Sequence, residues 1–193
     1  MFLKPDGQPL GMREAIQSGL STGTPGVLAM LAEAQRQHGR LAWARLFEPA
    51  IRLAERGFAI SPRLHELVGG EPALRDDPQA RAYFFDAAGR PKAVGAVLKN
   101  PAYAAVLRGI ARQGTKAFYE GPVAEDIVRR VQGHARSGLL TTADLAGYKP
   151  ALRPPLCAGW RSYRVCGFGP PSSGQLTLMQ ILGLLDTQPA AVA

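Results

Sequence analysis

The chain has 193 residues, of which 46% are hydrophobic, so it has the length of about one domain and enough apolar side chains to form a core. This composition excludes an intrinsically disordered chain. The formal net charge of +8 would suit a nucleic-acid partner. The arginines are scattered among acidic residues, however, and no basic run exceeds two residues, so we expect no nucleic-acid binding.

Residues 1–26 are rich in turns, and the segment KPDGQP is typical of a hairpin turn between two short apolar stretches. Thr24 and Pro25 are typical of the N-cap and first residue of a helix that ends at His38 and Gly39. Helical spacing predicts an apolar face for this helix, made of Val27, Leu28, Leu31 and Ala34.

Residues 42–57 predict a second helix that Gly57 ends, with a kink or a break near Phe47 because Pro49 lies in its middle. Its expected apolar face consists of Leu46, Ala50, Leu53 and Ala54. A Ser-Pro pair at residues 61–62 then predicts another helix start. Residues 71–99 are less periodic; they suggest a short apolar segment, a turn and then a strand or loop.

Residues 100–114 form the clearest amphipathic pattern, with Asn100 as N-cap, Gly114 at the end and an inward face of Tyr103, Val106, Leu107 and Ile110. Residues 121–135 repeat this pattern, with a stripe of Val123, Ile127, Val128 and Val131. Residues 141–148 predict a short capped helix. Alternation over residues 157–168 predicts one or two strands, and a long apolar helix follows from about Ser173.

The segment GPPSSGQ, residues 169–175, is the best candidate for a functional site. It does not match the G-x-S-x-G pattern of a nucleophilic serine, and no histidine lies near it with an acid to orient it. Ser172 and Gln175 have the spacing of a capping box, so we expect Ser172 and Ser173 to start the helix. The alternative is an anion bound by the N–H groups of this helix start.

No other group of residues predicts catalysis or metal binding. His38, His65 and His134 are far apart in the sequence from one another and from both cysteines, so we expect no metal site. STGTPG lacks the lysine and the spacing of a phosphate-binding loop. We expect most of the acidic residues to be solvated surface groups, among them Asp76, Asp77, Glu125, Asp126 and Asp144.

The cysteines and the N-terminus bear on the cellular compartment. Cys157 and Cys166 flank a predicted hairpin; we expect two small buried residues, with a disulfide as the alternative in an oxidising compartment. The polar residues after Met1 do not form the apolar segment of a signal peptide, and no apolar run is long enough for a membrane span. As given, the chain is therefore expected to be cytoplasmic.

Four segments, in this order, resemble the gamma-glutamyltranspeptidase family. Residues 23–61 contain G-x-P-G, a helix and L-x-PAI-x-LA-x-x-GF, and residues 98–128 contain a helix followed by FYEG. Residues 138–150 read GLLTTADLAGYKP, and residues 163–175 read YRVCGFGPPSSGQ, similar to Y-x-V-x-x-x-PPSSGG of the family. Gln175 stands where the family has a second glycine, and residues 186–193 also depart from the family pattern.

The resemblance implies an α+β fold, in which residues 1–193 are a single partial domain of an αββα Ntn-hydrolase: mostly helical, with a few strands near the C-terminal end. Family precursors cleave themselves into a large and a small subunit. The new N-terminal threonine attacks the gamma-glutamyl amide of glutathione, with its own amino group as base. The acyl group then passes to water, an amino acid or a peptide, without a metal or an organic cofactor. A cephalosporin or glutaryl acylase and a non-catalytic helical remnant are the alternatives.

The resemblance covers an interior part of the large subunit. The catalytic threonine lies in the small subunit, beyond Ala193, and the arginine that pairs with the substrate carboxylate lies before Met1. No catalytic, substrate-binding or metal residue is therefore assigned. We expect the complete family member to be periplasmic or secreted and this chain alone to be inactive. Without the central strands, we expect one helix face to lack partners, namely Leu178, Ile181, Leu182 and Leu185.

Overall fold

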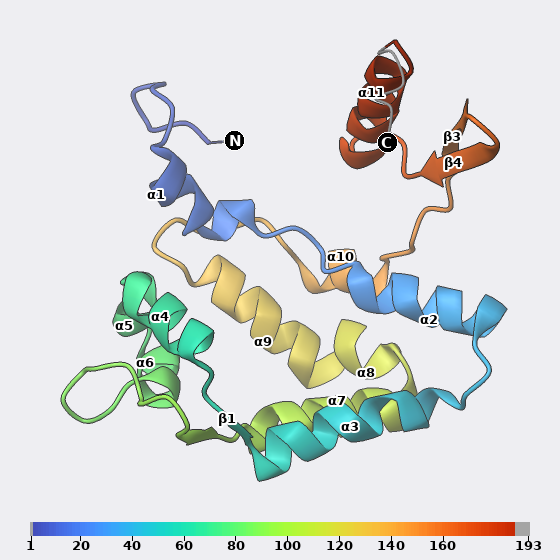
Figure 1. The fold of residues 1–193 in the computed structure, drawn as a ribbon. Helices are drawn as coiled ribbons and strands as arrows, with labels where there is room; N and C mark the ends of the chain where they lie inside the picture. The colour runs from blue at the N-terminus through green and yellow to red at the C-terminus, as the bar shows by residue number, and fades with distance from the viewer. Residues whose placement is uncertain (1, 188–193) are drawn as a thin grey trace. The chain divides into compact units, whose positions relative to one another are not determined.

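The computed structural model describes residues 2–187, and its residues group into two compact units, Met1–Pro150 and Ala151–Ala193 (Figure 1). The chain is mostly helical with a few short strands, as expected, but the strand Phe58–Ala59 lies in a segment where the sequence predicts none. The single partial domain over residues 1–193 stays a prediction, and residues 188–193, where the sequence departs from the family pattern, lie outside the described residues. No described helix combines the length and the apolar character that crossing a bilayer requires.

The first unit carries most of the helices and two short strands, which pair antiparallel. Its elements are α1 (Met12–Ile16), the 3-10 helix η1 (Gly19–Ser21), α2 (Val27–His38), α3 (Trp43–Arg56), β1 (Phe58–Ala59), α4 (Pro62–Gly70), α5 (Ala73–Asp76), α6 (Pro78–Phe84), β2 (Val97–Leu98), α7 (Pro101–Gln113), α8 (Lys116–Tyr119), α9 (Gly121–Gln132) and α10 (Thr142–Ala146). The second unit contains β3 (Leu156–Trp160), β4 (Tyr163–Gly167) and α11 (Gly174–Asp186).

Three helices begin at the polar residues that the sequence indicates. The Ser61 hydroxyl accepts a hydrogen bond from Leu64 N–H at 3.1 Å, and Asn100 Oδ1 accepts one from Tyr103 N–H at 2.9 Å. Thr141 and Asp144 form a reciprocal capping box at the start of α10. The predictions of α4, α7 and α10 are thereby confirmed, since each cap satisfies backbone donors that the first turn leaves free.

The start of α2 differs from the prediction. The helix begins at Val27 with Gly26 as its N-cap, so Thr24 and Pro25 lie outside it. The hydroxyl of Tyr119 accepts a hydrogen bond from Ala29 N–H at 3.2 Å and donates one to the Pro25 carbonyl at 2.6 Å. A side chain distant in the sequence therefore replaces the local cap. Of the predicted apolar face, Leu28 packs on the core, whereas the others are exposed: Val27, Leu31 and Ala34.

Helix α3 is unbroken through Pro49, so the predicted break does not occur. It lies beside α7 (Figure 1). The Trp43 indole N–H donates to the Ile110 carbonyl at 3.0 Å, and its ring packs edge-on against Phe47. This aromatic pair sets the inward face of α3. Of the predicted face only Ala54 is buried, and the rest is exposed: Leu46, Ala50 and Leu53.

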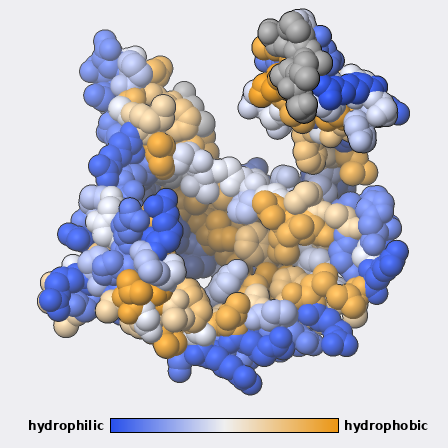
Figure 2. All heavy atoms as spheres, viewed as in Figure 1, coloured by the Kyte–Doolittle hydropathy of each residue, from blue (hydrophilic) through white to orange (hydrophobic). Residues whose placement is uncertain are grey.

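One core cluster joins α8, α9 and α10. Its buried residues are Tyr119, Ala124, Val131, Leu140 and Leu145, and side chains of α2 and α9 pack against them. In α9 the predicted stripe is confirmed at its C-terminal half, where Val131 is buried and Ile127 and Val128 pack on the cluster. In α7 Leu107 and Ile110 are buried as expected and Val106 is half-buried, but Ala104 takes the inward position and Tyr103 is exposed. Figure 2 shows apolar side chains, in orange, over the region of α8 and α9.

The sequence indicated the turns better than the shortest helices. Leu3 and Pro9 form an antiparallel bridge, which confirms the hairpin turn at KPDGQP, and Phe85 bridges Pro91 around the second turn. The sequence does not predict the helices α1, α5, α6 and α8, because segments of 4 to 7 residues show too little periodicity.

Candidate functional site

The junction from β4 to α11 holds the candidate segment GPPSSGQ. The strands β3 and β4 form the antiparallel hairpin that alternation predicted, with Cys157 directly opposite Cys166. The two sulfurs form a disulfide, Cys166 is exposed and Cys157 is half-buried. The expectation of two unlinked buried residues is therefore wrong: the hairpin register brings the cysteines together on a face that is not covered.

Gln175 is the residue that ties α11 to the hairpin. Its side chain is only 6% exposed, and its Nε2 donates a hydrogen bond to the Val165 carbonyl at 3.1 Å. Gly167 makes room for it, because a Cβ at residue 167 would lie 3.0 Å from Gln175 Cδ. The residue that departs from the family pattern therefore packs against β4.

The prediction for the two serines is confirmed in part. α11 begins at Gly174 with Ser173 as its N-cap, which confirms the helix start. The Ser173 side chain makes no cap hydrogen bond, both serines are exposed, and Gln175 points to β4, so the capping box of Ser172 and Gln175 is wrong. The bond that Gln175 makes to the strand takes the place of a bond back to the helix start. The anion-binding alternative stays a prediction.

The polar residues that the sequence singled out elsewhere lie in structural positions. Asp77 caps α6, with Oδ1 accepting from Ala80 N–H at 2.7 Å, and His65 Nδ1 lies 2.9 Å from the Lys92 carbonyl oxygen. Within residues 2–187 no group of three or more histidine, cysteine, aspartate or glutamate side chains could hold a metal ion. The remaining acids named above are exposed: Asp76, Glu125, Asp126 and Asp144.

The carboxyl groups with lowered pKa values also serve turns and caps. The hydrogen bond from the Thr141 hydroxyl holds the pKa of Asp144 below its usual value, and the Arg90 backbone N–H does the same for the pKa of Asp86. On the exposed side of α2 the side chain of Arg36 lowers the pKa of Glu33 to about 2. Perturbed pKa values often mark catalytic groups, but each of these has a local structural cause.

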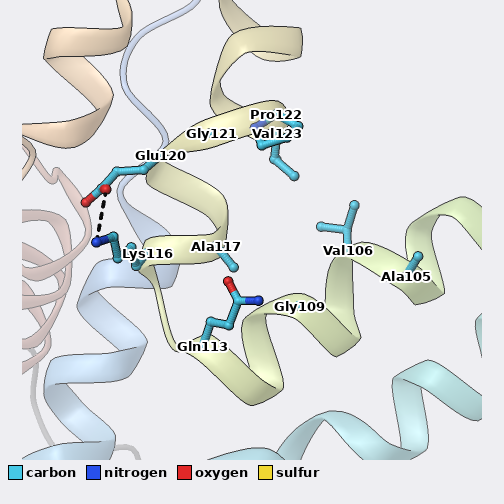
Figure 3. Close-up of a pocket in the computed structure, with 10 residues that line it drawn as sticks. All are labelled: Ala105, Val106, Gly109, Gln113, Lys116, Ala117, Glu120, Gly121, Pro122 and Val123. Carbon is cyan, nitrogen blue, oxygen red and sulfur yellow. Dashed lines mark ion pairs between the residues drawn. The ribbon is translucent and has the colours of Figure 1, made fainter.

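The pocket in Figure 3 is a shallow space of about 510 Å³ between α7, α8 and α9. Small and apolar side chains line it, among them Ala105, Val106 and Ala117. Its charged residues, Lys116 and Glu120, pair with each other at 3.5 Å, as the dashed line shows. The pocket therefore offers a contact surface and no acid, base or nucleophile positioned for a reaction.

Known proteins resemble this chain in both sequence and fold. Residues 1–191 match the family model described as Gamma-glutamyltranspeptidase. The chain belongs to this family. Glutathione hydrolase 2 of Arabidopsis thaliana is 38% identical over 172 residues, which are 88% of this chain and 29% of that protein. The crystal structure of Helicobacter pylori gamma-glutamyltranspeptidase is 30% identical, with a TM-score of 0.90 over 99% of this chain and 54% of that chain.

One relative of this gamma-glutamyltranspeptidase family member is named an acylase. The Acylase ACY 1 proenzyme of Pseudomonas sp. (strain V22) is 34% identical over 175 residues, 90% of this chain and 31% of that protein. The chain thus spans about a third of the length of the curated relatives it matches. The similarity confirms the family that the order of motifs indicates, and hydrolases and acylases both share it.

Proposed function

We propose that this chain is the large-subunit segment of an enzyme that cleaves the gamma-glutamyl amide of glutathione and transfers the acyl group to water, an amino acid or a peptide. The observation that carries the proposal is the family match over residues 1–191, together with the TM-score of 0.90 to the Helicobacter pylori transpeptidase. The Arabidopsis relative, named a glutathione hydrolase, supports the choice of substrate.

In this proposal the chain contributes scaffold and the small subunit contributes chemistry. An N-terminal threonine of the small subunit attacks the amide carbonyl, with its own amino group as base, and the acyl-enzyme is then resolved by water or an amine. The role of this chain is to supply helices that support the subunit interface, and it needs neither a metal nor an organic cofactor.

A chromogenic gamma-glutamyl anilide tests the first consequence. The chain incubated alone is expected to release no aniline above background, because the threonine nucleophile of the proposed mechanism belongs to the small subunit. Clear turnover by the purified chain would overturn the assignment of the chemistry to a second subunit.

A chimera tests the scaffold role. Residues 2–187 replace the superposed segment of the Helicobacter pylori transpeptidase, and cleavage of the precursor and release of the aniline from the gamma-glutamyl anilide are measured. We expect a processed, active chimera. A matched chimera with Leu107→Asp, a buried position of α7, should fail in both assays. An unprocessed chimera that folds by circular dichroism would contradict the proposal.

The acylase relative favours a second candidate, the hydrolysis of a glutaryl or cephalosporin amide. The active chimera cannot separate the two, because the host supplies its pocket. An assay of the protein encoded by the full coding sequence separates the two candidate functions. This protein is incubated with equal concentrations of a gamma-glutamyl anilide and a glutaryl anilide. We expect a higher kcat/KM for the gamma-glutamyl compound, and the reverse order would establish the acylase.

We also propose that the complete protein works in a periplasmic or extracellular compartment. The disulfide between Cys157 and Cys166 supports this, since such bonds persist in oxidising surroundings. Fractionation of cells that express the full coding sequence, followed by detection with an antibody, provides the test. Recovery of the protein solely in the cytosol would exclude the proposal.

A further inference from the structure

The outer face of the β3–β4 hairpin carries an accessible disulfide beside a cation. Side chains alternate along a strand, so Cys166 and Arg164 share one face of β4, and their partners Cys157 and Gly159 share that face on β3. The opposite face packs on α11, because Gly167 meets Gln175 there. The disulfide therefore faces away from the helix that the hairpin supports.

This face has room for a small molecule next to the sulfurs. A Cβ built on Gly159 would find no atom within 4 Å, so the position opposite Arg164 is open. Arg164 is exposed, and among residues 2–187 it has no acidic partner within ion-pair distance. A positive charge without a partner next to an open disulfide favours the approach of an anion that carries a thiol.

We propose that the Cys157–Cys166 disulfide is a site of thiol–disulfide exchange with anionic low-molecular-weight thiols, with Cys166 as the residue that is modified. The thiolate attacks Cys166 Sγ, a new sulfur–sulfur bond forms, and the Cys157–Cys166 bond breaks. Cys157 leaves as a thiolate and takes up a proton. A second thiolate then attacks the mixed disulfide, which releases the oxidised small molecule and leaves two reduced cysteines.

Accessibility determines the direction of this attack. Cys166 is exposed and Cys157 is half-buried, so we expect an incoming thiolate to attack the sulfur of Cys166 in preference to that of Cys157. Glutathione, which carries two carboxylates and a thiol, fits the required chemistry. Its choice as the natural thiol rests on the proposed function, whereas the exchange itself needs no gamma-glutamyl hydrolysis.

The test uses the full 193-residue chain, oxidised in air and incubated with reduced glutathione. The reaction is quenched with acid, and mass spectrometry of peptides locates the adduct. We expect a glutathione adduct on Cys166 in native buffer and comparable adducts on both cysteines in urea, where the face is lost. The proposal would be overturned if the adduct were distributed equally between the two cysteines in native buffer or if no adduct formed. Free thiols detected before glutathione is added would also overturn it.

Charge provides the second measurement. Glutathione is compared with neutral 2-mercaptoethanol and cationic cysteamine, with rates corrected for thiolate concentration and for the dependence of thiolate nucleophilicity on thiol pKa. We expect the anionic thiol to react fastest and Arg164→Glu to slow it by roughly threefold to tenfold at low salt. Arg40→Glu, an equal charge change at an exposed residue that does not belong to this hairpin, is the control for net charge and should have a smaller effect on the rate. Equal rates for the three thiols would contradict the role of Arg164, and failure of the chimera would leave these rates unaffected.

Discussion

At the scale of single residues, Tyr119 joins segments that are far apart in the sequence. Its hydroxyl contacts Pro25 and Ala29, and its ring stacks on Tyr148 with the centroids 6.1 Å apart. Gly26 lies against the Tyr148 hydroxyl, which leaves no space for a Cβ at that position. The start of α2 is therefore determined by tertiary contacts, and local sequence signals could not locate it.

Tyr119→Phe should lower the free energy of unfolding by about 1–2 kcal/mol, because it removes the hydrogen-bond partner of two partly buried backbone groups. Urea denaturation followed by circular dichroism measures the loss. Tyr103→Phe is the matched control, since Tyr103 is 54% exposed, and it should change stability by less than about 0.5 kcal/mol. Equal effects of the two substitutions would exclude the capping role of Tyr119.

Asp144 should make the start of α10 sensitive to acid. The Thr141 hydroxyl donates to the Asp144 carboxylate at 2.7 Å, and this bond lowers the pKa of Asp144. A carboxyl whose pKa is lower in the folded chain stabilises the fold above its unfolded pKa, and the contribution is lost as pH falls through the folded value. The cap should therefore weaken below about pH 4, the usual pKa of an aspartate.

NMR titration of the Asp144 carboxyl measures this effect directly. The variant Thr141→Val lacks the hydroxyl donor, so its Asp144 pKa should rise toward the usual value. The amide protons of α10 should then exchange faster than in the parent chain at the same pH. An unchanged Asp144 pKa in the variant would show that the hydroxyl bond is not its cause.

At the scale of elements, the sequence predicts those helices whose caps are local. The side chains of Ser61, Asn100 and Thr141 each accept a hydrogen bond from the backbone N–H three residues ahead, so their helices could be located from the sequence. The inward face of α3 could not be predicted from the sequence, because it depends on the contact of Trp43 with α7. In the candidate site, the spacing of Ser172 and Gln175 was misleading for the same reason: the partner of Gln175 lies on a strand.

Gln175→Ala should loosen the contact between α11 and the hairpin. The substitution leaves the Val165 carbonyl without its side-chain partner and creates a space beside Gly167, which should cost about 1–2 kcal/mol. Limited proteolysis within residues 174–187 measures the loosening, and cleavage should become faster. Gln180→Ala, an exposed position on the same helix, should leave the cleavage rate unchanged. Protection of Gln175→Ala equal to that of the parent would rule out the anchoring role.

At the scale of the whole molecule, apolar helix faces remain open to solvent. Leu31 of α2 is 51% exposed and Leu53 of α3 is 55% exposed. The sequence predicts that the apolar face of α11 lacks partners, and three of its four residues are exposed: Leu178, Ile181 and Leu185. The fourth residue, Leu182, is half-buried. The chain spans about a third of the related proteins, so under the proposed function the remaining parts of the enzyme would cover these faces.

The isolated chain should therefore self-associate as its concentration rises, because exposed apolar patches of this kind drive contacts between copies. Size-exclusion chromatography with light scattering over a range of concentrations measures the association. Leu46→Glu combined with Leu53→Glu should shift the distribution toward the monomer, because it removes apolar area from the exposed face of α3. Gln79→Glu combined with Gln180→Glu adds the same charge at exposed polar positions and should have a smaller effect. A monodisperse monomer at all concentrations would show that these faces are tolerated in water, and an equal response of the two pairs would assign the association to net charge.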